Sequence, residues 1–221
     1  MPLETGRPER AGVVLAGGYS TRFGERDKAV ADLAGTPMIR RVVDRLEPIV
    51  DELVINCRAE QVSAVETALE GGPTVSFAID PIPDRGPMAG IMTGFREASG
   101  EYAAVVACDM PFFDPDLVDH LFGRAAGHDA AVPRLDEQWY QPTQAVYQVA
   151  PMVAACERAL ERDERTIIEP LFALDYVVVD EAELRERTTL LTFENVNTRD
   201  ELAAAARRLE TDADDIPSGC S

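Results

Sequence analysis

The sequence predicts an α/β fold: a doubly wound, mostly parallel sheet with helices on both faces, in three layers. Three observations predict it. Short apolar runs alternate with amphipathic stretches of helical period through most of the 221 residues. Residues 102–107 are continuously apolar, which is typical of a central parallel strand buried on both faces. Glycine or a polar residue follows four predicted strands, where the ligand crevice of such a sheet lies.

The first half of the chain is expected to hold four strands, each followed by a helix. The strands are the apolar runs at residues 12–16, 53–56, 75–79 and 102–107. The helices are the stretches with one apolar face at 38–49, 60–69, 89–98 and 115–124. Gly71-Gly72-Pro73 ends the second helix, and Asp114 is expected to cap the fourth.

The second half is less regular. Strands are expected at residues 130–132, 143–149, 176–179 and 190–193, and helices at 152–160, 165–171 and 199–209; the charged segment 180–187 is left unassigned. No linker divides the chain, so residues 1–209 are interpreted as a single domain. Residues 210–221 are acidic and contain proline and glycine, which predicts a disordered tail.

The charge of the chain excludes some functions. Forty acidic residues against 21 basic ones give a net charge of −19, and the acids are spread along the sequence. Such a surface repels nucleic acid, so no nucleic-acid partner is expected. Dispersed acid with a single lysine also indicates a protein from a halophile, where high salt screens self-repulsion. The alternative is an acidic mesophile protein with biased codon usage.

The cysteines and histidines predict neither a metal site nor a redox centre. The four cysteines, at 57, 108, 156 and 220, have no CxxC spacing, and the two histidines do not complete a site with them. Scattered thiols fit the reducing cytoplasm. The polar N-terminus does not read as a signal peptide, and no apolar run reaches the ~20 residues of a membrane span, so a cytoplasmic location without membrane contact is expected.

A glycine-rich segment after the first strand is suited to phosphate. Gly17 and Gly18 allow close backbone approach, and their N–H groups can form an anion-binding nest. Arg22 and Lys28 add positive charge, and Lys28 is the only lysine of the chain. A compact ammonium group is suited to a triphosphate that must be bound and then released. The alternative is that the single lysine stands at this position by chance. Neither the Walker P-loop nor the GxGxxG pattern is present.

Two aspartates follow predicted strands. Asp109 follows an apolar strand, and a carboxylate beside phosphate-binding groups is a natural Mg²⁺ ligand; the alternative is that it only caps a turn. Asp80 opens the loop that leads to Gly86-Pro87-Met88-Ala89-Gly90. It can accept hydrogen bonds from a ribose or a base, or serve only as an Asx-turn residue.

These motifs together resemble a known family. LAGGYSTRFGERDK (residues 15–28) is similar to the LAGGxSxRxGxDK signature of nucleotidyltransferases, and Asn56, Asp80, GPMAG, CDMP, PTQAVY and NVNT follow in the family's order. From about residue 12 to 209, the chain resembles the MobA-type molybdenum cofactor guanylyltransferases, which have a Rossmann-like nucleotidyltransferase fold. The first motif is specific to the superfamily, and the guanylyl assignment rests on its combination with GPMAG.

The resemblance implies a role for each matching residue. Leu15, Ala16, Gly17 and Gly18 would bind guanine and phosphate through the backbone, and Lys28, with Arg22 nearby, would contact the GTP phosphates. Asn56 and Asp80 would lie on the nucleoside, and Asp109 would hold both GTP and Mg²⁺. The catalytic residues implied are Lys28, Arg22 and Asp109. Pro142, Thr143 and Asn197 match the region that receives the pterin. A proline often follows NVNT in the family, whereas this chain has Arg199.

The implied reaction is GMP transfer from GTP to the terminal phosphate of molybdopterin, with or without its molybdenum, with release of pyrophosphate. Molybdoenzymes or cofactor-insertion proteins would be transient partners. Three alternatives stay open: a cytidylyltransferase on the same cofactor, a nucleotidyltransferase acting on a sugar phosphate or another phosphorylated metabolite, and a non-catalytic nucleotide-binding protein. The short length, without room for a sugar-specific insertion, argues against the second. Retention of Lys28 and Asp109 argues against the third.

Overall fold

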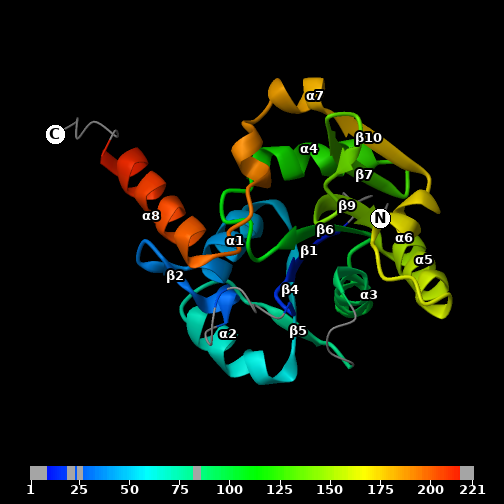
Figure 1. Cartoon of the computed structure of the whole chain (residues 1–221). Helices are drawn as coiled ribbons and strands as arrows, with labels where there is room; N and C mark the ends of the chain where they lie inside the picture. Colours follow the sequence, from blue (N-terminus) through cyan, green and yellow to red (C-terminus); the bar gives the residue numbers. More distant parts are fainter. Residues whose placement is uncertain (1–8, 19–22, 24–26, 82–85, 215–221) are drawn as a thin grey trace, which may run out of the picture.

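A central sheet of eight strands organises the protein in the computed structural model, which describes residues 9–18, 23, 27–81 and 86–214. Seven strands form the continuous path β10 (Tyr176–Asp180), β7 (Ala130–Leu135), β9 (Gln144–Gln148), β6 (Tyr102–Ala107), β1 (Arg10–Leu15), β4 (Glu52–Cys57) and β5 (Ser76–Ile79). The eighth, β8 (Trp139–Tyr140), pairs with β7. Figure 1 shows the sheet running through the middle of the molecule with helices on both sides.

The predicted doubly wound, mostly parallel sheet is confirmed, with two antiparallel exceptions, β9 and the short strand β8. The pairs β1–β6, β1–β4, β4–β5 and β7–β10 are parallel. Strand β9 runs antiparallel to both of its neighbours, β6 and β7. Because β6 and β7 are both antiparallel to β9, they run in the same direction as each other. Strands β7 and β10 therefore present their carboxyl ends at the same edge of the sheet as β6.

Helices cover the two faces of the sheet in separate groups. One face is covered by α1 (Met38–Leu46), α2 (Val62–Ala68), α4 (Pro115–Ala125) and α7 (Glu181–Arg185). The other is covered by α3 (Pro87–Glu97), α5 (Val149–Glu161) and α6 (Ile168–Phe172). Strand β6 divides its side chains between the two, since Ala104 and Val106 belong to the first core and Ala103 and Val105 to the second. Successive side chains of a strand point to opposite faces of the sheet, which explains this division.

The last helix, α8 (Arg199–Asp214), lies outside the two main layers. Its residues Leu202, Ala205 and Ala206 pack with Leu33 and Met38 in a third, smaller core. Leu33 belongs to a short hairpin that the sequence analysis did not assign, formed by β2 (Asp32–Leu33) and β3 (Thr36–Pro37). Figure 1 shows α8 beside β2 and α1, with its far end directed away from the sheet.

Two sequence predictions need correction. Residues 190–193, expected as a strand, form the 3₁₀ helix η4 (Leu190–Phe193). Phe193 enters the first core, and Thr192 Oγ1 accepts hydrogen bonds from Asp114 N and from the side chain of Gln144. Residues 210–214, expected to belong to a disordered tail, are instead the last residues of α8, and residues 215–221 of the expected tail lie outside the described part. The unassigned segment 180–187 contains α7, and Asp180 caps it.

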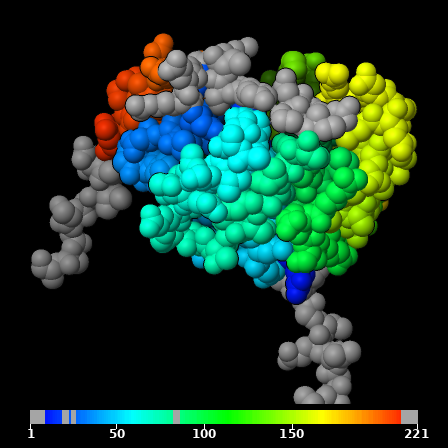
Figure 2. All heavy atoms as spheres, turned by 90° about the horizontal axis from the view of Figure 1, so that it is seen from below, coloured from blue at the N-terminus to red at the C-terminus, as the bar shows by residue number. Residues whose placement is uncertain are grey.

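Three short 3₁₀ helices complete the structure: η1 (Lys28–Val30), η2 (Glu47–Ile49), which extends α1, and η3 (Ala59–Gln61), which leads into α2. Seen from below in Figure 2, the chain from α2 to α3 (cyan to green) forms the middle of the surface, with α5 (yellow) at one side and α8 (red) at the other. Within the described residues, no helix is long and apolar enough to cross a membrane.

Candidate active site

A cavity of about 260 Å³ lies at the carboxyl edge of the sheet. Backbone hydrogen bonds extend the sheet to the floor of this cavity: Ala16 N donates to Asn56 O (2.8 Å), and Cys108 N donates to Leu15 O (3.0 Å). The cavity is lined by eight residues that the sequence analysis assigned to the site: Leu15, Ala16, Gly17, Gly18, Lys28, Asn56, Asp80 and Asp109. The ninth, Arg22, lies outside the described residues.

Asn56 and Asp80 form a fixed pair on one side of the cavity. Asn56 is only 2% exposed, and its Nδ2 donates to Asp80 Oδ1 (2.7 Å) and to Ala78 O (3.2 Å). The two side chains leave little space for a Cβ atom at the neighbouring glycines. A Cβ atom at Gly17 would lie 2.7 Å from Asp80 Oδ2, and one at Gly90 would lie 2.4 Å from Asn56 Oδ1. A larger residue in the turn after β1 or in the first turns of α3 would therefore force one of these side chains to shift.

Lys28 and Asp109 meet on the opposite side. Lys28 Nζ donates to Asp109 Oδ2 at 2.6 Å and to Asn197 Oδ1 at 3.0 Å, and both charged side chains are 16% exposed. Asp27 caps η1 by accepting from Ala29 N (3.0 Å), which fixes the backbone at the start of the helix that carries Lys28. On the other side, Val196 N donates to Asp109 O (2.8 Å). The NVNT turn therefore contacts both charged residues, Lys28 through Asn197 and Asp109 through Val196.

The second oxygen of Asp109 is suited to a metal. Oδ1 is buried and accepts no hydrogen bond from the described residues. A buried carboxylate oxygen without a partner is unfavourable, unless a ligand supplies one. The described residues contain no cluster of three or more acidic, histidine or cysteine side chains, so no cage made of protein alone is present there. Mg²⁺ does not need such a cage, since one or two carboxylates with phosphate oxygens and waters suffice. The site fits this ion.

The two cysteines near the cavity are not candidate nucleophiles. Burial, followed by the negative charges of Asp80 and Asp27, raises the pKa of the Cys57 thiol to about 11. Burial likewise raises the pKa of Cys108 far above its ordinary value, with Asp109 adding to the effect. Both thiols therefore stay neutral near pH 7, and a neutral thiol is a poor nucleophile and metal ligand.

The three residues matched to the pterin region have different surroundings. Thr143 lines the cavity. Asn197 is held by Lys28, and the Pro142 carbonyl accepts from Tyr147 Oη (2.8 Å). These contacts do not test a role in pterin binding, which stays a prediction. Arg199, at the position where the family often has proline, begins α8 as an ordinary helix residue, and its Nε donates to Phe23 O (3.2 Å).

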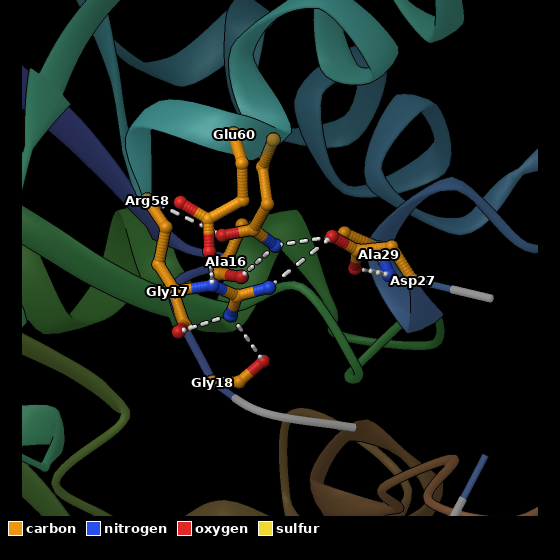
Figure 3. Close-up of polar contacts among 8 residues, drawn as sticks. Ala16, Gly17, Gly18, Asp27, Ala29, Arg58 and Glu60 are labelled. Atoms are coloured by element: carbon orange, nitrogen blue, oxygen red, sulfur yellow. Dashed lines mark hydrogen bonds and ion pairs between the residues drawn. The ribbon is translucent and has the colours of Figure 1, made fainter. Parts of the chain in front are cut away.

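The sequence analysis missed a group of polar side chains beside the glycine turn. Figure 3 shows Arg58 reaching the carbonyl groups of Gly17 and Gly18, with Asp27 close by. Gln61 bonds to both Ala16 and Asp27. The available signal was the position of Arg58, two residues after Asn56 at the end of an apolar strand. An arginine buried at such a place must find several acceptors.

Comparisons with known proteins agree with this geometry. A family model for the MobA-like NTP transferase domain matches residues 12–177. A protein of the halophile Natronomonas pharaonis, named a probable molybdenum cofactor guanylyltransferase, is 52% identical over 202 residues, covering 91% of this chain and 98% of the relative. The molybdenum cofactor guanylyltransferase of Pseudomonas putida strain F1 is 34% identical over 170 residues, covering 75% and 83%.

Solved structures place the fold in the same group. Molybdopterin-guanine dinucleotide biosynthesis protein A from Archaeoglobus fulgidus superimposes with a TM-score of 0.76 at 31% identity, covering 91% of this chain and 99% of that one. The 4-diphosphocytidyl-2C-methyl-D-erythritol synthase of Anaerococcus prevotii has a TM-score of 0.72 at 12% identity, covering 92% and 96%. At that identity the second likeness concerns the fold alone.

Proposed function

Because the chain belongs to the MobA-like NTP transferase family, we propose that it transfers GMP from GTP to the terminal phosphate of molybdopterin, with or without bound molybdenum. Pyrophosphate leaves, and the guanine dinucleotide form of the cofactor is the product, which then passes to a molybdoenzyme or an insertion protein. The observation that carries the proposal is the contact between Lys28 and Asp109 in the cavity beside the glycine turn. A cation and a carboxylate so placed can act on one triphosphate.

The reaction needs no general base. The attacking phosphate oxygen is already an anion, so it forms its bond to the α-phosphorus without losing a proton while the bond to the leaving pyrophosphate breaks. The two histidines are engaged elsewhere, His120 Nε2 with Glu183 Oε1 (2.7 Å) and His128 Nδ1 with Asp175 Oδ2 (3.0 Å). Neither lines the cavity. Catalysis then rests on aligning two anions and stabilising the charge of the leaving group.

The residues of the cavity divide this task. The N–H groups of Gly17 and Gly18 bind phosphate oxygens, as backbone nests do. Lys28 releases Asp109 and stabilises the negative charge that develops on pyrophosphate. The Asn56–Asp80 pair, which is fixed on the other side of the cavity, binds the nucleoside through its polar atoms. Arg22 is proposed to add a second positive charge near the phosphates.

Mg²⁺ is the proposed cofactor, and Asp109 is its proposed ligand. When bound, the ion would neutralise phosphate charge and polarise the phosphorus that is attacked. Oδ1 of Asp109 offers a buried acceptor for it, while Oδ2 becomes available as Lys28 turns to the phosphates.

The test is nucleotide-dependent release of pyrophosphate. The purified chain is incubated with molybdopterin, Mg²⁺ and one of GTP, CTP, ATP or UTP, and pyrophosphate is measured together with the dinucleotide product. GTP is expected to be the preferred donor, and release is expected to require both molybdopterin and Mg²⁺. Preference for CTP would point to the cytidylyl reaction instead. Absence of release with all four nucleotides would contradict a catalytic function.

A further inference from the structure

Arg58 binds the backbone of the phosphate turn instead of its ligand. The residue follows β4 directly and is 8% exposed. Its Nη1 donates to Gly17 O at 2.7 Å and to Gly18 O at 2.9 Å. Figure 3 shows the guanidinium lying against these two carbonyl groups. One side chain therefore determines the direction of two successive peptide groups.

The direction of a carbonyl group also determines that of the next amide. A trans peptide group is planar, with its C=O and N–H on opposite sides, and the described residues contain no cis peptide. The Gly17 carbonyl faces Arg58, so the N–H of Gly18 points the other way. Gln61 Nε2 binds the carbonyl of Ala16 (2.9 Å), which turns the N–H of Gly17 away in the same manner. Neither of these amides donates a hydrogen bond within the described residues.

The same side chains also hold the residue before Lys28. Gln61 Nε2 donates to Asp27 Oδ2, and Arg58 Nη2 lies 3.9 Å from the same oxygen. Arg58 N in turn donates to Gln61 Oε1 at 2.8 Å, which joins the two side chains into one unit. Figure 3 shows Asp27 and Ala29 on one side of this unit and Gly17 and Gly18 on another. The two ends of the glycine-rich segment, at Gly17 and at Asp27, thus contact the same pair of side chains.

The charge of Arg58 is already matched by carboxylates. Its Nε donates to Glu60 Oε1 at 2.7 Å, and Asp27 lies on its other side. The planar fork of arginine can serve two carbonyl groups and two carboxylates at once, whereas the ammonium of lysine cannot reach the same set. These contacts favour a role in holding the turn over direct binding of phosphate.

We propose that Arg58, assisted by Gln61, is a positioning residue that aims the N–H groups of Gly17 and Gly18 at the nucleotide phosphates and fixes Lys28 through Asp27. The inference rests on the proposed function, since it names the part of the site that binds the triphosphate. It predicts a loss confined to phosphate binding. The nucleoside side of the cavity is held by bonds of its own, from Asn56 Nδ2 to Asp80 Oδ1 and to Ala78 O.

The test compares the binding of GTP with that of guanosine. Dissociation constants are measured by calorimetric titration in Mg²⁺, without molybdopterin, for wild type, Arg58→Met and Arg58→Lys. Arg58→Met is expected to weaken GTP binding ~10-fold or more, the effect of losing one charge-assisted hydrogen bond. Guanosine binding is expected to change less than ~2-fold, since these charged contacts all lie on the phosphate side. Arg58→Lys is expected to restore GTP binding only in part.

Arg41→Met is the matched control. Arg41 also donates to two successive carbonyl groups of a turn, Leu33 O (2.6 Å) and Ala34 O (3.1 Å), but it does not line the cavity. It is expected to bind GTP and guanosine as wild type does. Wild-type GTP binding by Arg58→Met, or equal loss of GTP and guanosine binding, would overturn the inference.

Two further arrangements keep the test decisive. If Arg58→Met does not fold, Arg58→Lys keeps the charge and decides the question, because unchanged GTP binding by that variant contradicts the need for a fork. Failure of the proposed function is recognised separately, by a wild type that binds GTP without releasing pyrophosphate in the presence of molybdopterin. A wild type that prefers CTP is tested with CTP and cytidine in place of GTP and guanosine.

Discussion

Lys28 Nζ lies 2.6 Å from Asp109 Oδ2, although the two residues are 81 positions apart in the chain. The only lysine of the protein thus contacts a carboxylate that follows the end of β6 by two residues. Both side chains are 16% exposed, so water screens the pair only in part. In the proposed reaction each partner leaves the other, Lys28 for the phosphates and Asp109 for Mg²⁺. Substitution of either residue is therefore expected to affect turnover.

Substitution of Lys28 or Asp109 is expected to abolish most of the activity. Lys28→Ala and Asp109→Ala should each lower turnover by ~10²-fold or more, as does the loss of one electrostatic stabiliser in other enzymes. Lys28→Arg should also be impaired, because a planar fork does not replace a compact charge. Steady-state pyrophosphate release at saturating GTP measures all three. A wild-type rate for Lys28→Arg would contradict the argument from the ammonium group.

Gly90→Ala is expected to damage the nucleoside side of the cavity. Alanine normally favours a helix over glycine by about 0.5–1 kcal/mol. At this position, however, the new Cβ would lie 2.4 Å from Asn56 Oδ1, so the Asn56–Asp80 pair must shift. We expect weaker guanosine binding and a lower melting temperature. Gly123→Ala in α4 is the control, because a Cβ there meets no atom within 4 Å, and it should raise the melting temperature.

Glu201 is expected to make stability depend on pH. Hydrogen bonds from Asn197 N (2.6 Å) and Thr198 N (2.9 Å) favour the charged carboxylate and lower the pKa of Glu201 below its ordinary value of 4.5. A lowered folded-state pKa means that the stabilisation is present above the unfolded value and is lost as the pH falls through the folded value. Glu201→Gln should therefore melt below wild type at pH 7, and the difference should shrink below about pH 4.5.

Glu210→Gln is the control for that comparison, since Glu210 lies near the other end of the same helix and is exposed. It should leave the melting temperature at pH 7 close to that of wild type. A Glu201→Gln difference of the same size at pH 4 and pH 7 would exclude titration of this carboxylate as its cause.

Salt is expected to stabilise the protein. A net charge of −19 produces self-repulsion in dilute buffer, and the screening length falls from ~10 Å at 0.1 M to ~3 Å at 1 M salt. The melting temperature should rise between 0.1 and 2 M KCl, as suits a chain that is 52% identical to a protein of a halophile. Scanning calorimetry over that range is the measurement, and an unchanged or falling melting temperature would refute the expectation.

The pattern of apolar residues within each segment predicted most of the helices and strands. Residues 102–107 were expected as a buried strand and form β6 with the same limits, because an apolar run between turn residues leaves few alternatives. The direction of β9 was not predicted, because periodicity does not report direction. The short connection from β7 excluded a helical crossover and was the missed signal. Residues 190–193 were predicted wrongly, because a short segment with three apolar residues fits a strand and a buried helical turn equally well.

The site was predictable to the extent that it follows the ends of strands. Gly17, Asn56, Asp80 and Asp109 were placed together because parallel strands bring their carboxyl ends to one edge. Arg58 was not placed there. Its position after an apolar strand signals a buried arginine that needs acceptors, but no spacing in the sequence encodes which backbone oxygens the side chain meets. Contacts between a side chain and a distant main-chain atom appear only once the fold is known.

The turn that supplies Asn197 is made 169 residues after Lys28, and Val196 beside it binds the main chain at Asp109. During translation the glycine turn, the lysine and the aspartate all leave the ribosome long before this last segment. A nascent polypeptide can therefore assemble most of its central sheet while Lys28 still lacks its contact with Asn197. If Lys28 acts on the nucleotide as proposed, competence for nucleotide chemistry is expected only after this last segment has been synthesised.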